Sequence, residues 1–233
     1  MKNRRIDVAV CLSLFAVALA IGLVRAALKP RPHTPEEFGL AYEVGAVDMN
    51  GNGLDDYTDL LIGARRDAEN RPIYNGRYWE SAYPPPFIGV CTDVGWRAFR
   101  EAGYNLRAMV DYDVRLRPEA YPGITEPDDK IDFRRVRNLK VFFDEYGRRL
   151  TTDPLDIAAW QAGDIVIFGE RDGTPTHFGI ISDKRNADGV AYVIHNAGQP
   201  DRDEDVLNTM HVVGHYRFDA SVIDGELLIP WQE

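Results

Sequence analysis

The decisive stretch of this 233-residue chain is Gly89-Val90-Cys91-Thr92-Asp93-Val94-Gly95-Trp96-Arg97-Ala98-Phe99-Arg100. Three prolines at 84–86 come just before it and disfavour a helix there, because proline lacks the backbone N–H and restricts the residue ahead of it. Apolar residues then recur at helical spacing, which predicts a helix that begins near Cys91. Free N–H groups and the helix dipole at such a terminus favour a thiolate. Cys91 is therefore either a nucleophile or a buried structural cysteine.

The chain begins with a basic and then apolar segment. Lys2, Arg4 and Arg5 precede an almost unbroken apolar run from Val8 to Val24. This order is typical of an export signal, and a run of this length is at the lower limit for a span that stays in the bilayer. We expect residues 1–30 to be a signal peptide or a signal anchor. The protein would then be exported, and either secreted to the cell envelope or held at the membrane by its N-terminus.

Export affects how Cys91 is interpreted. The second cysteine, Cys11, lies in the apolar run, so Cys91 has no disulfide partner in the exported body. A lone thiol in an oxidising compartment favours a reactive role.

The rest of the chain has the composition of one acidic globular domain. We expect residues 31–44 to be a spacer and residues 45–233 to be the domain. The formal net charge is −10, and residues 1–30 carry five basic side chains and one acidic one, a net of +4, so the body carries −14. A charge of this sign argues against nucleic acid as the main partner.

The body divides into a helical first half and a β-rich second half. Turn residues separate the later segments, and this pattern favours antiparallel pairing. We expect an α+β domain whose helical half packs on a small antiparallel sheet. Besides the helix at Cys91, the expected helices cover 57–69, 104–114 and 133–146, and the expected strands cover 164–168, 176–182, 190–195 and 211–218.

The segment 48–59 has the spacing of a calcium-binding loop, with a glycine at its sixth position. The ligand positions would be held by Asp48, Asn50, Asn52, Leu54, Asp56 and Asp59. Asp59 is shorter than the usual glutamate, so the expected affinity is weak, roughly 10⁻⁴–10⁻³ M. The alternative is a plain Asn-Gly turn in which Asp55 caps the following helix. Structural Ca²⁺ is thus one of two interpretations, and no cofactor is expected for catalysis.

Two histidines could serve Cys91 as a base. His177 opens one predicted strand and His195 closes the next. If these strands form an antiparallel pair, the start of one lies beside the end of the other, and the two imidazoles become neighbours. The cysteine helix packed across that edge would complete a Cys–His–His cluster. Each histidine alone could be structural, and no metal-binding spacing supports a zinc site.

Six segments together carry a family resemblance. They are Gly89-Val90-Cys91-Thr92-Asp93-Val94, Asp132-Phe133-Arg134-Arg135-Val136-Arg137-Asn138-Leu139, Trp160-Gln161-Ala162-Gly163-Asp164-Ile165-Val166, His177-Phe178-Gly179-Ile180-Ile181-Ser182-Asp183, Ile194-His195-Asn196 and Gly214-His215-Tyr216-Arg217. Over about residues 45–220 the chain resembles a family of exported bacterial proteins known only as a domain of unknown function. That family is grouped with the papain-like cell-wall peptidases and amidases related to NlpC.

The resemblance implies a papain-like, NlpC-type fold with Cys91 as nucleophile and His177 as base. His195 would orient His177, and Asn196 is the alternative third member. The implied activity is thiol-dependent hydrolysis of amide bonds, with peptidoglycan stem peptides or another cell-envelope peptide as substrate. Two alternatives stay open: a non-catalytic cell-envelope binding module on the same fold, and an acyl- or lipid-directed thiol hydrolase or transferase.

Overall fold

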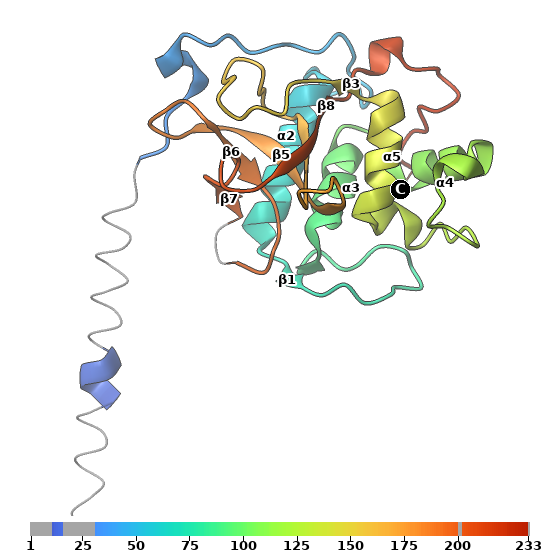
Figure 1. Ribbon diagram of the computed structural model, residues 1–233, viewed down its shortest axis with the longest axis horizontal. Coiled ribbons are helices and arrows are strands. Elements are labelled where there is room, and N and C mark those ends of the chain that lie inside the picture. Colours follow the sequence, from blue (N-terminus) through green and yellow to red (C-terminus); the bar gives the residue numbers. More distant parts are fainter. Residues whose placement is uncertain (1–10, 16–30, 200–201, 233) are drawn as a thin grey trace, which may run out of the picture. The chain divides into compact units, whose positions relative to one another are not determined.

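The computed structural model describes residues 11–15, 31–199 and 202–232 (Figure 1). The chain divides into two compact units, Met1–Pro32 and His33–Glu233. In the first unit the described residues 11–15 are helical and exposed, and the rest of the predicted signal segment lies outside the described residues. Within the described ranges, no helix combines the length and apolarity that a membrane span requires.

The helices of the second unit come mainly before the sheet in the chain, as predicted. The segment predicted as one helix at 133–146 is divided, because Arg135 has an extended backbone (φ −105°, ψ 120°) between two helical pieces. The elements are η1 (Pro35–Phe38), α2 (Asp56–Asn70), α3 (Cys91–Glu101), α4 (Leu106–Leu116), η2 (Pro118–Ala120), η3 (Asp132–Arg134), α5 (Val136–Tyr146) and η4 (Ala220–Val222).

The main sheet has six strands in the order β3-β8-β4-β5-β6-β7, and every neighbouring pair is antiparallel. The predicted α+β class, with helices on an antiparallel sheet, is therefore confirmed. A separate parallel pair, β1 (Ile73–Tyr74) and β2 (Ile88–Gly89), leads directly into α3. The main strands are β3 (Arg148–Arg149), β4 (Ile165–Gly169), β5 (Pro175–Arg185), β6 (Ala191–Ile194), β7 (Asp203–Glu204) and β8 (Val212–Arg217).

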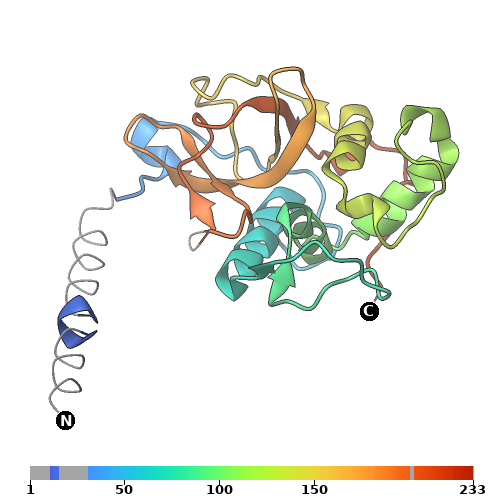
Figure 2. The same cartoon turned by 60° about the horizontal axis from the view of Figure 1, so that its bottom comes forward.

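Both faces of the sheet are buried. Alternate residues of β5 divide between two hydrophobic clusters, with Phe178 and Ile180 in the cluster that the helices share and Ile181 in a second cluster around Trp160. This division follows from the two-residue period of a strand. Figure 2 shows α2 and α3 lying together against one side of the sheet.

Helix α3 is held closely between α2 and β5. A Cβ on Gly63 of α2 would stand 2.7 Å from the Cα of Ala98, and a Cβ on Gly95 would stand 2.8 Å from the Phe178 ring. Such contacts need residues without side chains at the two points of closest approach. The two glycines thus let the cysteine helix pack directly on its neighbours.

The predicted spacer at 31–44 is shorter than expected from the sequence. His33 and Arg185 exchange two backbone hydrogen bonds of 2.8 Å, and Pro35 is buried. Glu43 forms ion pairs with Arg148 and Arg217. Residues from His33 onward therefore belong to the folded unit, because both backbone pairing and charge attach them to the sheet.

Candidate active site

Cys91 is the first residue of α3, where the sequence placed it. The N-cap residue Val90 has an extended backbone and cannot cap the helix through a polar side chain. Asp93 supplies the cap instead, because its carboxylate accepts the Val90 N–H at 2.7 Å. The Cys91 side chain is only 5% exposed.

Asp93 also connects α3 to η3 through a buried ion pair. Its two oxygens accept from Nε and Nη2 of Arg134 at 2.7 and 2.8 Å, and from Trp96 Nε1 at 2.8 Å. The Thr92 hydroxyl donates to the Arg134 carbonyl at 3.0 Å. Since two-point pairing fixes orientation as well as distance, these contacts fix the helix terminus that carries the thiol.

The two histidines are neighbours, as the strand pairing predicted. Strands β5 and β6 are antiparallel, with Ile180 opposite Ile194. His177 Nε2 lies 2.8 Å from His195 Nδ1, with the two rings nearly perpendicular at 89°. Both side chains are buried, so the pair is separated from bulk water.

Glu204 and Gln199 both approach the outer nitrogen of this pair, His195 Nε2. The Glu204 Oε2 lies 3.2 Å from His195 Nε2, and an ionised carboxylate can only accept a hydrogen bond. The Gln199 amide nitrogen, which can only donate, lies 3.2 Å from the same His195 Nε2. When His177 donates its Nε2–H to His195, its Nδ1 is unprotonated, which is the form that a general base requires. Glu204 was missed from the sequence, because nothing local marks the two-residue strand β7 as a neighbour of β6.

Cys91 lies against the strand that carries His177. The backbone N–H of Phe178, the residue after His177, lies close enough to the Cys91 sulfur to lower the pKa of the thiol. The predicted helix terminus and the predicted histidine strand thus meet at the thiol.

Burial determines the protonation states of the site. It raises the pKa of the Cys91 thiol to about 11, although the N–H groups of Phe178 and Thr92 act in the opposite direction. Burial also lowers the pKa values of His177 and His195 to about 4. The helix-terminus argument alone favoured a thiolate, but desolvation disfavours every charged form here. The resting site therefore holds a thiol and neutral imidazoles.

Tyr74 borders the thiol on the solvent side. It pairs with Gly89 in the parallel ladder and is 48% exposed. Burial of its hydroxyl, and then the nearby Cys91, raise the pKa of the Tyr74 phenol. A Cβ on Gly198 would stand 3.5 Å from the Tyr74 Cβ, so the loop after β6 lies on its other side. No sequence pattern indicated this residue.

Asn196, the alternative third member, has other partners. Its amide donates to the carbonyls of Pro72 and Gly89 at 3.3 and 3.2 Å, and its Oδ1 accepts the Gly198 N–H at 3.0 Å. The geometry therefore favours His195 as the residue that orients His177, whereas Asn196 attaches β1 and β2 to the main sheet.

The loop at 48–59 is closed by its own hydrogen bonds. The Asp48 carboxylate accepts from the backbone N–H groups of Gly51, Asn52 and Gly53 at 2.8, 3.1 and 2.8 Å. The amides of Asn50 and Asn52 donate to Asp59 at 2.7 and 3.0 Å. These hydrogen bonds are the ones expected of an Asn-Gly turn, the alternative to a calcium loop.

The remaining members of the predicted calcium set are bonded in the same way. Asp56 accepts from Tyr104 and from the Met49 N–H, and the Leu54 N–H donates to Asn52. Asp55 caps α2 as predicted, by accepting the Tyr57 N–H. Across the described ranges, no group of three or more His, Cys, Asp or Glu side chains is placed to hold a metal ion. Calcium binding stays a prediction.

The fold and site define a class: an α+β domain with helices on an antiparallel sheet, a cysteine at the start of a helix, and a bonded histidine pair on the sheet that the helix packs against. Residues 61–218 match the model of the family described as a domain of unknown function, DUF1287, and the chain belongs to this family. The uncharacterized protein YijF of Escherichia coli K12 is 37% identical over 172 residues, which are 69% of this chain and 82% of that protein. No solved structure matches the chain.

The buried histidines predict a loss of stability in mild acid. Unfolding restores their ordinary pKa of 6.5, so between pH 6.5 and about 4 the unfolded state binds protons that the folded state does not, and the free energy of unfolding falls. His195→Gln should reduce this fall by about 2 kcal/mol between pH 7 and pH 4.5. Urea denaturation at pH 7 and pH 4.5 measures the fall in the free energy of unfolding, and a substitution of the exposed His211, His211→Gln, is the control. Equal falls in the parent and in His195→Gln would contradict the assignment.

The loop at 48–59 predicts a large effect for one carboxylate. Asp48→Ala leaves the N–H groups of Gly51 and Gly53 without their acceptor, while the Asn52 N–H keeps Asn50 Oδ1, and should lower the free energy of unfolding by about 1–2 kcal/mol. The control Asp172→Ala removes a single such acceptor at an exposed turn. Melting curves with and without millimolar Ca²⁺ test the ion. If Ca²⁺ raises the melting temperature of the parent but not that of Asp48→Ala, calcium binding is supported. If Ca²⁺ does not raise the melting temperature of the parent, calcium binding is rejected.

Proposed function

We propose that this protein is a thiol-dependent hydrolase of amide bonds with a papain-like, NlpC-type arrangement. The observation that carries the proposal is the bond between His177 Nε2 and His195 Nδ1, made where the strand of His177 meets the thiol of Cys91. A nucleophile, a base and a group that orients the base are the three parts of a catalytic triad. Here they are Cys91, His177 and His195.

The reaction follows from the resting protonation states. Because the thiol and the imidazoles rest neutral, the Cys91 proton passes to His177 Nδ1 as the sulfur attacks the carbonyl carbon. Backbone N–H groups in the first turn of α3 would stabilise the oxyanion. His177 then gives its proton to the leaving amine, and a thioester remains on Cys91. Water, deprotonated by His177, attacks the thioester and releases the acid.

The proposed substrate is a stem peptide of peptidoglycan or another cell-envelope peptide. The family resemblance of the cysteine and histidine segments supports this choice, and the basic and apolar N-terminal sequence supports an exported protein, secreted or anchored in the membrane. The acidic composition of the body agrees with a partner other than nucleic acid. Catalysis would need no cofactor, and Ca²⁺ would be structural.

Burial of the thiol favours one rival, the non-catalytic binding module. A cysteine that is 5% exposed, with a pKa raised to about 11 by burial, has the environment of a structural residue if no base acts on it. The role of His177 therefore separates the two candidates.

The first test is peptide release from purified cell-wall sacculi or defined muropeptides. The parent protein should generate new amino groups, Cys91→Ala should generate none, and His177→Gln should lose at least about a hundredfold in rate, as expected for the loss of a general base. Asn196→Ala, which keeps the Cys–His–His cluster, is the matched control and should retain activity if it folds. Equal release by the parent and Cys91→Ala would reject the thiol mechanism. Release only from lipid esters would favour the acyl-directed alternative.

The second test measures the reactivity of Cys91 directly. At pH 7 a thiol of pKa about 11 is almost entirely protonated, so fast alkylation by iodoacetamide requires that His177 take the proton. We expect His177→Gln to slow carboxamidomethylation of Cys91 at least about tenfold. Peptide mass spectrometry follows Cys91, and free cysteine in the same buffer gives the reference rate. Equal Cys91 rates in the two proteins would favour the binding module.

A further inference from the structure

An open groove of about 450 Å³ lies between the beginnings of α5 and β5. It is lined by Arg135, Val136, Arg137, Pro175 and Thr176. Thr176 directly precedes the proposed base. Arg135 directly follows Arg134, whose carbonyl accepts a hydrogen bond from the hydroxyl of Thr92, the residue after Cys91. Each wall of the groove is therefore one residue along the chain from a residue of the candidate site or of its support.

The groove presents two arginines that no carboxylate neutralises by contact. Arg135 and Arg137 are exposed, and in the described part of the chain neither forms an ion pair. Arg137 donates one hydrogen bond of 3.0 Å to the Gly123 carbonyl. The carboxyl of Asp132 is close enough to feel both charges: burial raises its pKa and the two arginines lower it. The two arginines and this one carboxylate together leave the groove with a net positive charge.

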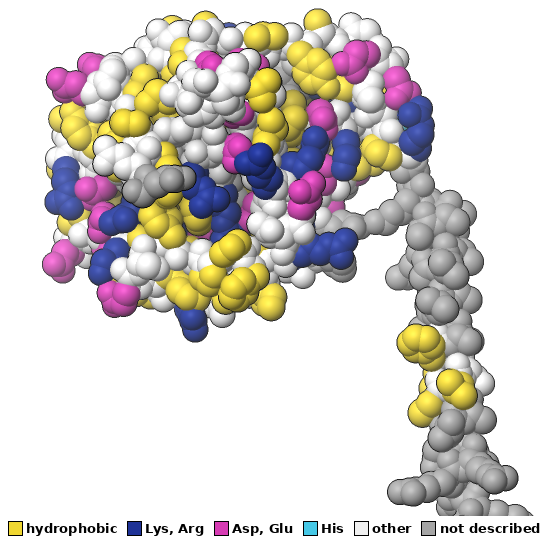
Figure 3. Space-filling view, turned by 180° about the vertical axis from the view of Figure 1, so that it is seen from behind, with side chains coloured by type: hydrophobic (Ala, Val, Ile, Leu, Met, Phe, Trp, Pro, Cys, Tyr) yellow, Lys and Arg dark blue, Asp and Glu magenta, His cyan; other side chains and the backbone are white. Residues whose placement is uncertain are grey.

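Some other surface arginines of this acidic protein are paired, whereas Arg71, Arg77, Arg100 and Arg171 are also exposed and form no ion pair among the described residues. Arg115 is paired with Asp111 at 2.9 Å, and Arg149 is paired with Asp144 at 3.5 Å. On the face seen in Figure 3, Lys and Arg side chains lie beside Asp and Glu side chains. Arginines left without such partners next to a reactive thiol have charge available for a ligand.

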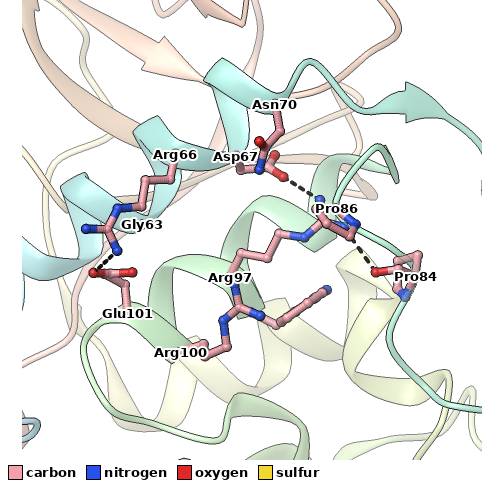
Figure 4. A pocket seen from close by; sticks show the side chains of 10 residues that line it. Gly63, Arg66, Asp67, Asn70, Pro84, Pro86, Arg97, Arg100 and Glu101 are labelled. Atoms are coloured by element: carbon pink, nitrogen blue, oxygen red, sulfur yellow. Dashed lines mark hydrogen bonds and ion pairs between the residues drawn. The ribbon is translucent and has the colours of Figure 1, made fainter.

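A second pocket, between α2 and α3, contrasts with this groove (Figure 4). It measures about 90 Å³, and Arg97 and Arg66 at its wall are already paired with Asp67 and Glu101. Arg97 also donates to the Ile88 carbonyl at 2.8 Å. Its arginines hold the two helices together, and the pocket is much smaller than the groove.

We propose that the groove binds a carboxylate group of the substrate and positions it beside the amide that Cys91 attacks. This inference rests on the proposed hydrolase function and names a substrate class within it: peptides with a free carboxylate near the scissile bond. Guanidinium groups match carboxylates in charge and in planar hydrogen-bond geometry. A peptide whose carboxylate is amidated would lose this contact.

The test compares two alkylating reagents of similar size at Cys91 of the full chain, anionic iodoacetate and neutral iodoacetamide. At low ionic strength, Arg135→Gln/Arg137→Gln should lower the ratio of the iodoacetate rate to the iodoacetamide rate at least about threefold, because two positive charges near the thiol are lost. A change in the thiolate fraction affects both reagents equally and cancels in the ratio. Arg135→Lys/Arg137→Lys keeps both charges and should retain most of the ratio.

The matched control is Arg115→Gln/Arg149→Gln, which removes the same charge from α4 and β3 and should leave the ratio unchanged. An unchanged ratio in Arg135→Gln/Arg137→Gln, or an equal fall in the control, would overturn the carboxylate groove while Cys91 reactivity still supports the hydrolase. If parent Cys91 reacts with neither reagent faster than Cys91 of His177→Gln does, the hydrolase proposal fails, and the groove inference fails with it. Melting curves of each variant establish that it is folded.

Discussion

The buried ion pair between Asp93 and Arg134 is the contact on which the candidate site depends. The two side chains are 0% and 1% exposed, and the pair joins the first turn of α3 to η3 by two parallel hydrogen bonds. Removing one partner of such a pair leaves an uncompensated buried charge, which commonly costs about 3–5 kcal/mol. Since Asp93 also caps Val90, the same carboxylate fixes both the helix terminus and the residue that leads into Cys91.

The chemistry of the site follows from its burial more than from its helix terminus. Oriented N–H groups near Cys91 act to stabilise a thiolate, yet the pKa of the thiol is raised to about 11 because water is excluded. The same exclusion lowers the pKa of His177 to about 4. The bond between His177 Nε2 and His195 Nδ1 compensates in part, since it holds the two neutral rings in one orientation. The site therefore has a defined orientation and rests without charge on its sulfur.

Much of the fold was predictable, because local periodicity and turn residues determine it. The start of α3 at Cys91 followed from prolines ahead of an apolar pattern, and the meeting of His177 with His195 followed from the antiparallel pairing of adjacent strands. Glu204 and Tyr74 could not be found in this way. Each reaches the site through pairing of two-residue strands, whose partners are chosen by the whole tertiary structure and by no local signal.

The segment Arg134-Arg135-Val136-Arg137 shows how one short sequence can have two roles. The backbone is helical in η3, extended at Arg135, and helical again from Val136, so successive side chains do not share one face. Arg134 is directed into the protein and pairs with Asp93, while Arg135 and Arg137 stay on the surface beside β5. The support of α3 and the charged wall of the groove thus come from adjacent residues. A displacement of this segment would move the thiol and the groove together, which would keep a bound carboxylate in register with the sulfur.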